Sequence, residues 1–188
     1  MPELPDAKRG RFAERYGITA YDAGVLTATR TLADYFEAVV RAGAPPKAAA
    51  NWIQTELLRR LNDAAKNISE SPVRPEAFAG LLRGVENNEI TGAVGKRVFA
   101  KMFETGKPAA EIIASEGLSP ITDAESVENI CRETLEKNPE NVAKYRAGNE
   151  GVFKFFVGQV MRETRGRANP QTISDILKRL LRQSQEVK

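Results

Sequence analysis

The clearest folding signal in the chain lies in residues 148–183, which read GNEGVFKFFVGQVMRETRGRANPQTISDILKRLLRQ. The apolar residues of this stretch recur every three or four positions, a spacing that gives a helix one buried face. Gly166 interrupts the pattern and Asn169–Pro170 restarts it, because glycine favours helix ends and these two residues favour helix starts. The stretch therefore predicts two helices joined by a tight basic turn, a helix-turn-helix-like corner.

The remainder of the chain has the same helical periodicity. No segment shows sustained period-two alternation, and no Asn-Gly or Asp-Gly pair marks a hairpin, so we expect an all-α protein. Thr122 and Glu125 have the spacing of a capping box at one helix start. The predicted helices cover residues 6–16, 20–28, 31–42, 47–66, 75–87, 91–105, 108–115, 123–137, 140–147, 149–165 and 170–183.

A change of composition at residues 117–121, Gly-Leu-Ser-Pro-Ile, has the character of a flexible linker. It predicts two helical domains, a helical-bundle domain over residues 1–117 and a small tail domain over residues 118–188. Positive charge gathers at the end of the tail, where residues 145–188 hold 9 Lys and Arg against 4 Asp and Glu. Such a local excess can steer phosphate groups.

The residue types that the chain lacks exclude several kinds of chemistry. There is no histidine and one cysteine, Cys131. Histidine-activated nucleophiles, intrachain disulfides and cysteine-rich zinc sites are therefore excluded. No glycine-rich phosphate loop is present, so we predict no catalytic residue and no metal ligand in this chain. Without an apolar run near the roughly 20 residues of a membrane helix, and without a signal peptide, we expect a cytoplasmic protein that does not associate with membranes.

A helical wheel places a basic row on the predicted helix at 149–165, opposite its apolar stripe. Lys154, Arg162 and Arg165 share this row, with Gly158 in the middle. A glycine there either lets a sugar-phosphate backbone approach the helix or fits a close contact between helices. Phe155, beside the row, either stacks on an unpaired base or is covered by a neighbouring helix.

The turn after this helix adds a second basic feature. Arg165 and Arg167 flank Gly166, and the amides that begin the last helix after Asn169 are placed to receive a phosphate. Lys178 lies on the predicted outer face of that helix. A weaker nucleic-acid candidate is the polar face of the helix at 91–105, which carries Lys96, Arg97 and Lys101.

Three runs of sequence resemble a known family. Residues 2–27, PELPDAKRGRFAERYGITAYDAGVLT, resemble the region just after the catalytic core of the B subunit of the glutamine-dependent aspartyl/glutamyl-tRNA amidotransferase. Residues 47–62, KAAANWIQTELLRRLN, are similar to the helical domain of that subunit. Residues 155–181, FFVGQVMRETRGRANPQTISDILKRLL, resemble the tail domain that the B subunit shares with the YqeY family. The resemblance implies a helical domain followed by a YqeY-like tail.

Through this resemblance the chain is expected to be part of a carbon-nitrogen ligase. The family phosphorylates the side-chain carboxylate of Glu-tRNA(Gln) or Asp-tRNA(Asn) with ATP and amidates it with ammonia. The A subunit of the family releases that ammonia from glutamine, and the small C subunit holds the other two together. The ATP and magnesium sites of the family lie in an N-terminal cradle domain that is absent here, so this chain alone is expected to be non-catalytic and to bind no cofactor.

The resemblance does carry over a role for the tail, as a clamp on the elbow and D-loop of tRNA(Gln) or tRNA(Asn). The A and C subunits are implied as partners through the full-length B subunit. An alternative is a protein-interaction scaffold that supports the cradle domain without touching RNA. The predicted RNA-binding residues are Lys154, Gly158, Gln159, Arg162, Arg165, Gly166, Arg167, Asn169 and Lys178.

Overall fold

A computed structural model describes residues 5–121 and 123–183 of the chain. Within these residues the regular secondary structure is helical throughout, which confirms the all-α prediction. The chain divides into two compact units, residues 1–117 and residues 118–188.

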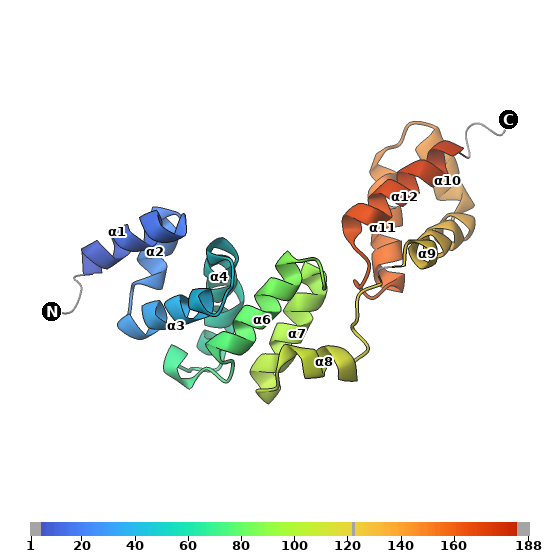
Figure 1. Cartoon of the computed structure of the whole chain (residues 1–188). Coiled ribbons are helices and arrows are strands. Elements are labelled where there is room, and N and C mark those ends of the chain that lie inside the picture. Colours follow the sequence, from blue (N-terminus) through green and yellow to red (C-terminus); the bar gives the residue numbers. More distant parts are fainter. Residues whose placement is uncertain (1–4, 122, 184–188) are drawn as a thin grey trace. The chain divides into compact units, whose positions relative to one another are not determined.

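Unit 1 is built from short helices, several of which start at threonine caps. The side chains of Thr19, Thr29 and Thr91 each accept a hydrogen bond from the backbone amide three residues later, which satisfies a donor that the helix leaves open. The helices are α1 (Pro5–Tyr16), α2 (Ala20–Leu26), α3 (Arg30–Arg41), α4 (Pro46–Trp52), α5 (Leu58–Asp63), α6 (Pro75–Glu86), α7 (Gly92–Thr105) and α8 (Ala109–Ser115), with a 3-10 turn, η2, at Ile68–Glu70 (Figure 1).

Two aromatic clusters form the core of this unit. Phe12 packs on Phe36, with ring centroids 5.3 Å apart, and joins α1 to α3. Phe99 of α7 packs on Phe78 of α6, with centroids 4.8 Å apart, and on Trp52 of α4 at 6.3 Å. Buried aromatic pairs contribute both apolar area and preferred ring geometry, so these clusters hold the helices of unit 1 together.

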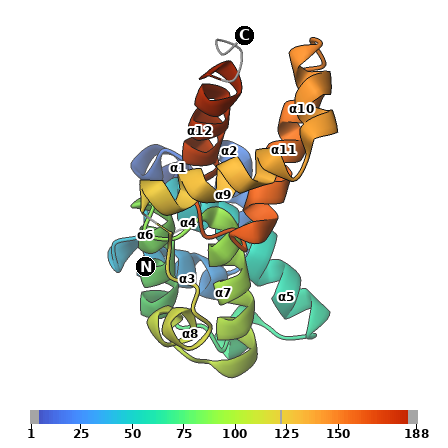
Figure 2. The same cartoon turned by 90° about the vertical axis from the view of Figure 1, so that its right-hand side faces the viewer.

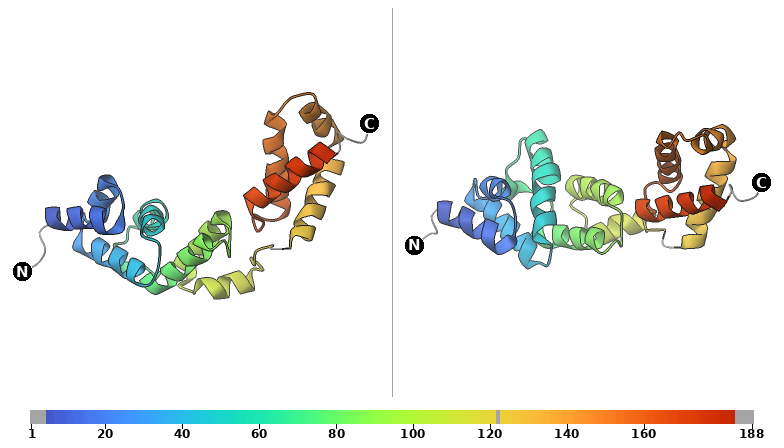
Figure 3. Two further views of the ribbon diagram at one scale, coloured as in Figure 1. Left: turned by 45° about the horizontal axis from the view of Figure 1, so that its top comes forward. Right: turned by 90° about the horizontal axis from the view of Figure 1, so that it is seen from above.

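The helix predicted at 47–66 differs from the structure in its middle. A π-helical turn, η1 (Ile53–Leu57), lies between α4 and α5, and the backbone N–H of Leu58 donates to Ile53 O. The side chain of Thr55 satisfies a backbone carbonyl beside the turn, since its Oγ1 donates to Asn51 O at 2.9 Å. Figure 3 shows α4, η1 and α5 as one continuous helix. A π turn inserts one residue into the helical register and is frequent at functional sites.

Unit 2 consists of α9 (Ala124–Glu136), α10 (Pro139–Arg146), α11 (Gly151–Glu163) and α12 (Pro170–Gln183). Helices α9, α11 and α12 pack against one another, as Figures 1 and 2 show. The predicted apolar stripe of α11 is confirmed, since Phe156 and Val160 are buried, and Phe153 and Val157 pack against the same core. The core of unit 2 comprises Val127, Cys131, Phe156, Val160, Ala168, Ile173, Ile176, Leu177, Leu180 and Leu181.

The start of α9 differs from the capping box predicted from Thr122 and Glu125. Thr122 lies outside the described residues. Asp123 is the N-cap, and its carboxylate accepts hydrogen bonds from the backbone N–H groups of Glu125 and Ser126. The hydroxyl of Ser126 also donates to this carboxylate. That hydrogen bond, followed by those from the two backbone N–H groups, lowers the pKa of Asp123 below its ordinary value. Nearby, the N–H of Ile121 donates to Arg167 O at 3.2 Å.

Candidate nucleic-acid interface

One face of α11 carries two cationic residues and a glycine that do not pack in the core of unit 2. Lys154, Gly158 and Arg162 are all exposed on it, opposite the buried Phe156 and Val160. Within the part of the chain that the structure describes, the side chains of Lys154 and Arg162 form no hydrogen bond and no ion pair. Two cations without an intramolecular carboxylate remain available for an anion from outside.

Gly158 separates these two cations. A Cβ atom built at this position meets no atom within 4 Å, so the predicted alternative of a close helix–helix contact is wrong within the described residues. A glycine in a helix interior costs about 1 kcal/mol relative to alanine. The chain therefore accepts a less stable helix at a position where nothing in the described part of unit 2 requires the small residue.

The residues beside Gly158 extend this face. Phe155 is 37% exposed and makes an edge contact with Phe156, with centroids 5.6 Å apart, so the neighbouring helices do not cover it fully. Gln159, which was predicted as an RNA contact, is half-buried. An exposed aromatic ring and an amide next to two cations are groups that suit stacking on a base and hydrogen bonding to RNA.

Arg165 was predicted to continue the row of α11, but it lies beyond the end of the helix. The N–H of Gly166 donates to Met161 O at 2.8 Å, and that of Arg165 donates to Arg162 O at 3.0 Å. This pair of hydrogen bonds is the Schellman motif, which needs a left-handed residue directly after the helix cap. Arg165 takes that position with a φ of 53°, and Gly166 follows with a φ of 74°. The exposed guanidinium therefore projects from the corner and not from the helix row.

Two other predicted contacts hold the corner itself. Arg167 Nε donates to Thr164 O at 3.2 Å, and Asn169 Oδ1 accepts a hydrogen bond of 2.8 Å from the N–H of Gln171. Because Pro170 has no N–H, the predicted phosphate site loses both of the first amides of α12. The backbone N–H of Gln171 already donates to Asn169 Oδ1. The prediction that this amide receives a phosphate is therefore wrong.

Lys178 lies on α12 and is exposed, as predicted, but its ammonium is placed over the ring of Phe153, 5.8 Å from the centroid. Its neighbour Arg179 forms an ion pair with Glu128 of α9. The same carboxylate also pairs with Arg132 at 2.8 Å. These ion pairs distinguish the outer face of α12 from α11, where neither Lys154 nor Arg162 forms an ion pair with any residue that the structure describes.

Residues 5–121 and 123–183 contain no group of three or more His, Cys, Asp or Glu side chains that could hold a metal ion. Burial raises the pKa of the Cys131 thiol to about 11, which keeps the sulfur protonated and unreactive near neutral pH. None of the helices in the described part of the chain is both long and apolar enough to cross a membrane.

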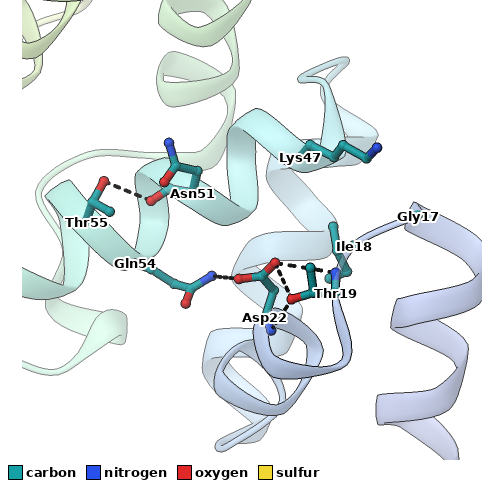
Figure 4. Close-up of a pocket in the computed structure, with 8 residues that line it drawn as sticks. All are labelled: Gly17, Ile18, Thr19, Asp22, Lys47, Asn51, Gln54 and Thr55. Carbon is teal, nitrogen blue, oxygen red and sulfur yellow. Dashed lines mark hydrogen bonds between the residues drawn. The ribbon is translucent and has the colours of Figure 1, made fainter.

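Unit 1 contains a pocket of about 390 Å³ that the sequence did not predict, and most of the residues that line it are polar (Figure 4). Asp22 is fixed there by Gln54 Nε2 at 2.8 Å and by Thr19 Oγ1 at 2.7 Å. The hydrogen bond from Gln54, followed by that from Thr19, lowers the pKa of Asp22. Lys47 and Asn51 also line the pocket. These hydrogen bonds favour the ionised form of Asp22, so the pocket contains a fixed carboxylate together with the ammonium of Lys47.

Comparison with known proteins gives a consistent result. The sequence profile of the GatB domain family matches residues 34–181. Proteins named as the B subunit of aspartyl/glutamyl-tRNA(Asn/Gln) amidotransferase match nearly the whole chain. The protein from Nitrosococcus oceani is 47% identical over 182 residues, and that from Carboxydothermus hydrogenoformans is 46% identical over 178 residues. The protein from Geobacter sulfurreducens is 44% identical over 182 residues.

These matches cover 96%, 95% and 97% of this chain but 38%, 37% and 38% of the respective relatives. The chain thus spans well under half the length of the curated relatives it matches, and it corresponds to their C-terminal part. The resemblance inferred from the NWIQTELL and FFVGQVM runs is confirmed.

Proposed function

The chain belongs to the GatB domain family, and from this premise we propose that it is a tRNA-binding and positioning module. It would serve the ATP-dependent, glutamine-hydrolysing amidotransferase that converts Glu-tRNA(Gln), Asp-tRNA(Asn) or both into the amidated forms. The observation that carries the proposal is the α11 face, where Lys154 and Arg162 flank an open Gly158.

This geometry supports binding to a sugar-phosphate backbone. A strand that approaches Gly158 meets no side chain at the helix surface, so the ammonium of Lys154 and the guanidinium of Arg162 can reach phosphates on either side. Each phosphate that a cation neutralises releases counterions, which makes the binding favourable and dependent on salt. Arg165, exposed at the corner, adds a third cation after the helix end.

The module acts at a distance from the chemistry. By holding the tRNA body it turns the arrival of the acceptor end at the active site into an intramolecular event, with a raised effective concentration. ATP and magnesium bind in the N-terminal domain of the full-length B subunit, with which the A and C subunits assemble. The activity takes place in the cytoplasm, where aminoacyl-tRNA is made and used.

Fluorescence anisotropy of the chain with tRNA(Gln), tRNA(Asn) and a third tRNA across a salt series tests this function. Lys154→Gln with Arg162→Gln should lower the log–log salt slope by about 1 for each lost phosphate contact, about 2 in all. A matched control removes the same charge from unit 2 through Arg132→Gln with Lys137→Gln, whose cations pair with Glu128 and Glu133.

The control should leave the slope within about half a unit of the unmodified chain, because its cations already have carboxylate partners. Equal effects of the two double variants would mean that net charge alone matters and would refute the α11 interface. An absence of tRNA binding by the unmodified chain would refute the proposed function and favour a protein-interaction scaffold.

A further inference from the structure

A buried carboxylate in unit 1 gathers three cations around it. Glu56 lies in the π turn η1 and is 5% exposed. Its Oε2 atom lies 3.0 Å from Arg59 Nη2 and 4.0 Å from Arg60 Nη2, and its Oε1 atom lies 3.1 Å from Lys96 Nζ on α7. One negative charge thus faces three positive charges.

The cations around Glu56 are not equivalent. Arg60 is three-quarters covered, and its guanidinium lies over the ring of Phe99, 6.0 Å from the centroid. The side chains of Arg59 and Lys96 are each 59% exposed. Since a guanidinium carries five N–H donors and an ammonium three, a single carboxylate leaves most of the donors of Arg59 and Lys96 facing water.

Close helix packing brings these two cations together. A Cβ atom at Gly95 would lie 2.7 Å from Val85 Cγ2 on α6 and 3.1 Å from Trp52 Cη2 on α4, so only a glycine lets α7 approach these two helices this closely. Lys96 follows Gly95 directly on α7 and reaches the carboxylate of Glu56 from there. Arg59 reaches the same carboxylate from the first turn of α5.

Two other exposed lysines of the same unit each face a carboxylate of their own and lack this surplus of charge. Lys101 pairs with Glu116 at 2.8 Å, and Lys107 pairs with Glu111. The basic residues predicted as a nucleic-acid site on α7 therefore do not act as one group. Lys101 pairs with Glu116, whereas Lys96 belongs to the cluster around Glu56.

We propose that Arg59 and Lys96 form a second phosphate-binding surface, on unit 1, which contacts the sugar-phosphate backbone of the same RNA that the α11 face binds. Glu56 is a positioning residue, since it holds both cations before the RNA arrives and so reduces the side-chain entropy lost on binding. The inference rests on the proposed function, because it takes its ligand from the tRNA-binding role of the chain.

The test uses the full chain and a tRNA(Gln) transcript in the same salt series. Arg59→Gln with Lys96→Gln should lower the salt slope by about 2, or about 1 for each contact. The matched control, Lys101→Gln with Lys107→Gln, removes the same charge from the same unit and should change the slope by less than about half a unit.

A further variant guards against misfolding, because removing both cations leaves the buried Glu56 with fewer partners. Glu56→Gln combined with Arg59→Gln and Lys96→Gln removes the buried charge as well, and it changes the net charge of the chain by only one unit. We expect the same loss of about 2 in the slope, and circular dichroism should show the helical content of the unmodified chain.

The outcomes separate this inference from the proposed function. If Lys154→Gln with Arg162→Gln lowers the slope but neither cluster variant does, the second surface is refuted and the α11 interface stands. If the salt slope of the triple variant falls by no more than the loss of one net charge would explain, the cluster serves only the stability of unit 1. That result also overturns the inference. If the unmodified chain binds no tRNA, both proposals fail together.

Discussion

Replacing Gly158 by alanine should stabilise the protein and weaken RNA binding at the same time. The position lies inside α11, and a Cβ atom there meets no atom within 4 Å, so the new methyl group causes no clash within the described residues. The helix then gains the difference in propensity between glycine and alanine, about 1 kcal/mol in the free energy of unfolding. Few exposed substitutions are expected to stabilise a protein by this much.

The same methyl group occupies the surface that the proposed interface leaves to the RNA backbone. Gly158→Ala moves the closest approach outward, and Gly158→Leu does so over a larger area between Lys154 and Arg162. For the leucine variant we expect the Kd for tRNA to rise about tenfold, a loss of about 1.4 kcal/mol of binding free energy. Urea unfolding followed by circular dichroism measures the first effect, and anisotropy at constant salt measures the second.

Gly80 provides the matched control. It lies inside α6, it is exposed, and a Cβ atom there also meets nothing within 4 Å. Gly80→Ala should give a similar gain in stability with no change in tRNA affinity. The reasoning is refuted if Gly158→Leu binds tRNA as the unmodified chain does, or if both glycine variants weaken binding equally.

Other features of the structure lead to further predictions. Arg165→Gly should raise the free energy of unfolding by about 1 kcal/mol, because glycine adopts the left-handed conformation without strain. The same substitution should weaken tRNA binding, because it removes a cation. A lower stability of the variant in urea unfolding would show that Arg165 is not strained. Gly95→Ala should cost about 1–3 kcal/mol in the same assay, because its Cβ overlaps Val85 and Trp52. Burial holds the pKa of Cys131 near 11, above the ordinary value of 9.0, so the stability it contributes is present below about pH 9 and lost as the pH rises toward 11. Rapid alkylation of the native thiol at pH 8 would contradict that burial.

Most helices could be predicted from sequence because their signals are local. Apolar spacing and the glycine, proline and threonine signals define elements such as α7 and α12 to within about two residues. The π turn at Ile53–Leu57 could not be predicted in this way. Trp52, Ile53, Leu57 and Leu61 are buried at the spacing of an ordinary helix, so the change lies in the backbone hydrogen bonds and not in the side-chain pattern.

The candidate site was also predicted only in part, in its helical residues but not in those of the corner. The row of Lys154, Gly158 and Arg162 follows from helical periodicity alone and lies on one face of α11 as predicted. Arg167 and Asn169 have the right chemistry for RNA, but the backbone of the corner uses the same groups. Sequence does not distinguish a donor or acceptor that is available to a ligand from one that caps a helix.

The cluster around Glu56 was missed because it is not local. Arg59 and Arg60 follow Glu56 at three and four residues, a spacing that signals ion pairs on a helix and could have drawn attention to it. Lys96 joins from α7, forty positions later in the chain, and only the fold places it beside the same carboxylate. Groupings that depend on tertiary contacts of this kind are outside what helical periodicity can predict.

The exposed face of α11 has a consequence for how such a protein can change over time. The side chains of Lys154 and Arg162 form no hydrogen bond or ion pair within the described part of unit 2, and a Cβ atom at Gly158 meets no atom within 4 Å, so substitutions on this face leave the packing of the core unchanged. Under the proposed function, a lineage can therefore alter its preference among RNA ligands by exchanging a few residues of one helix, while the buried side of that helix keeps the domain intact. The same independence makes this helix face a practical place to graft a different recognition surface.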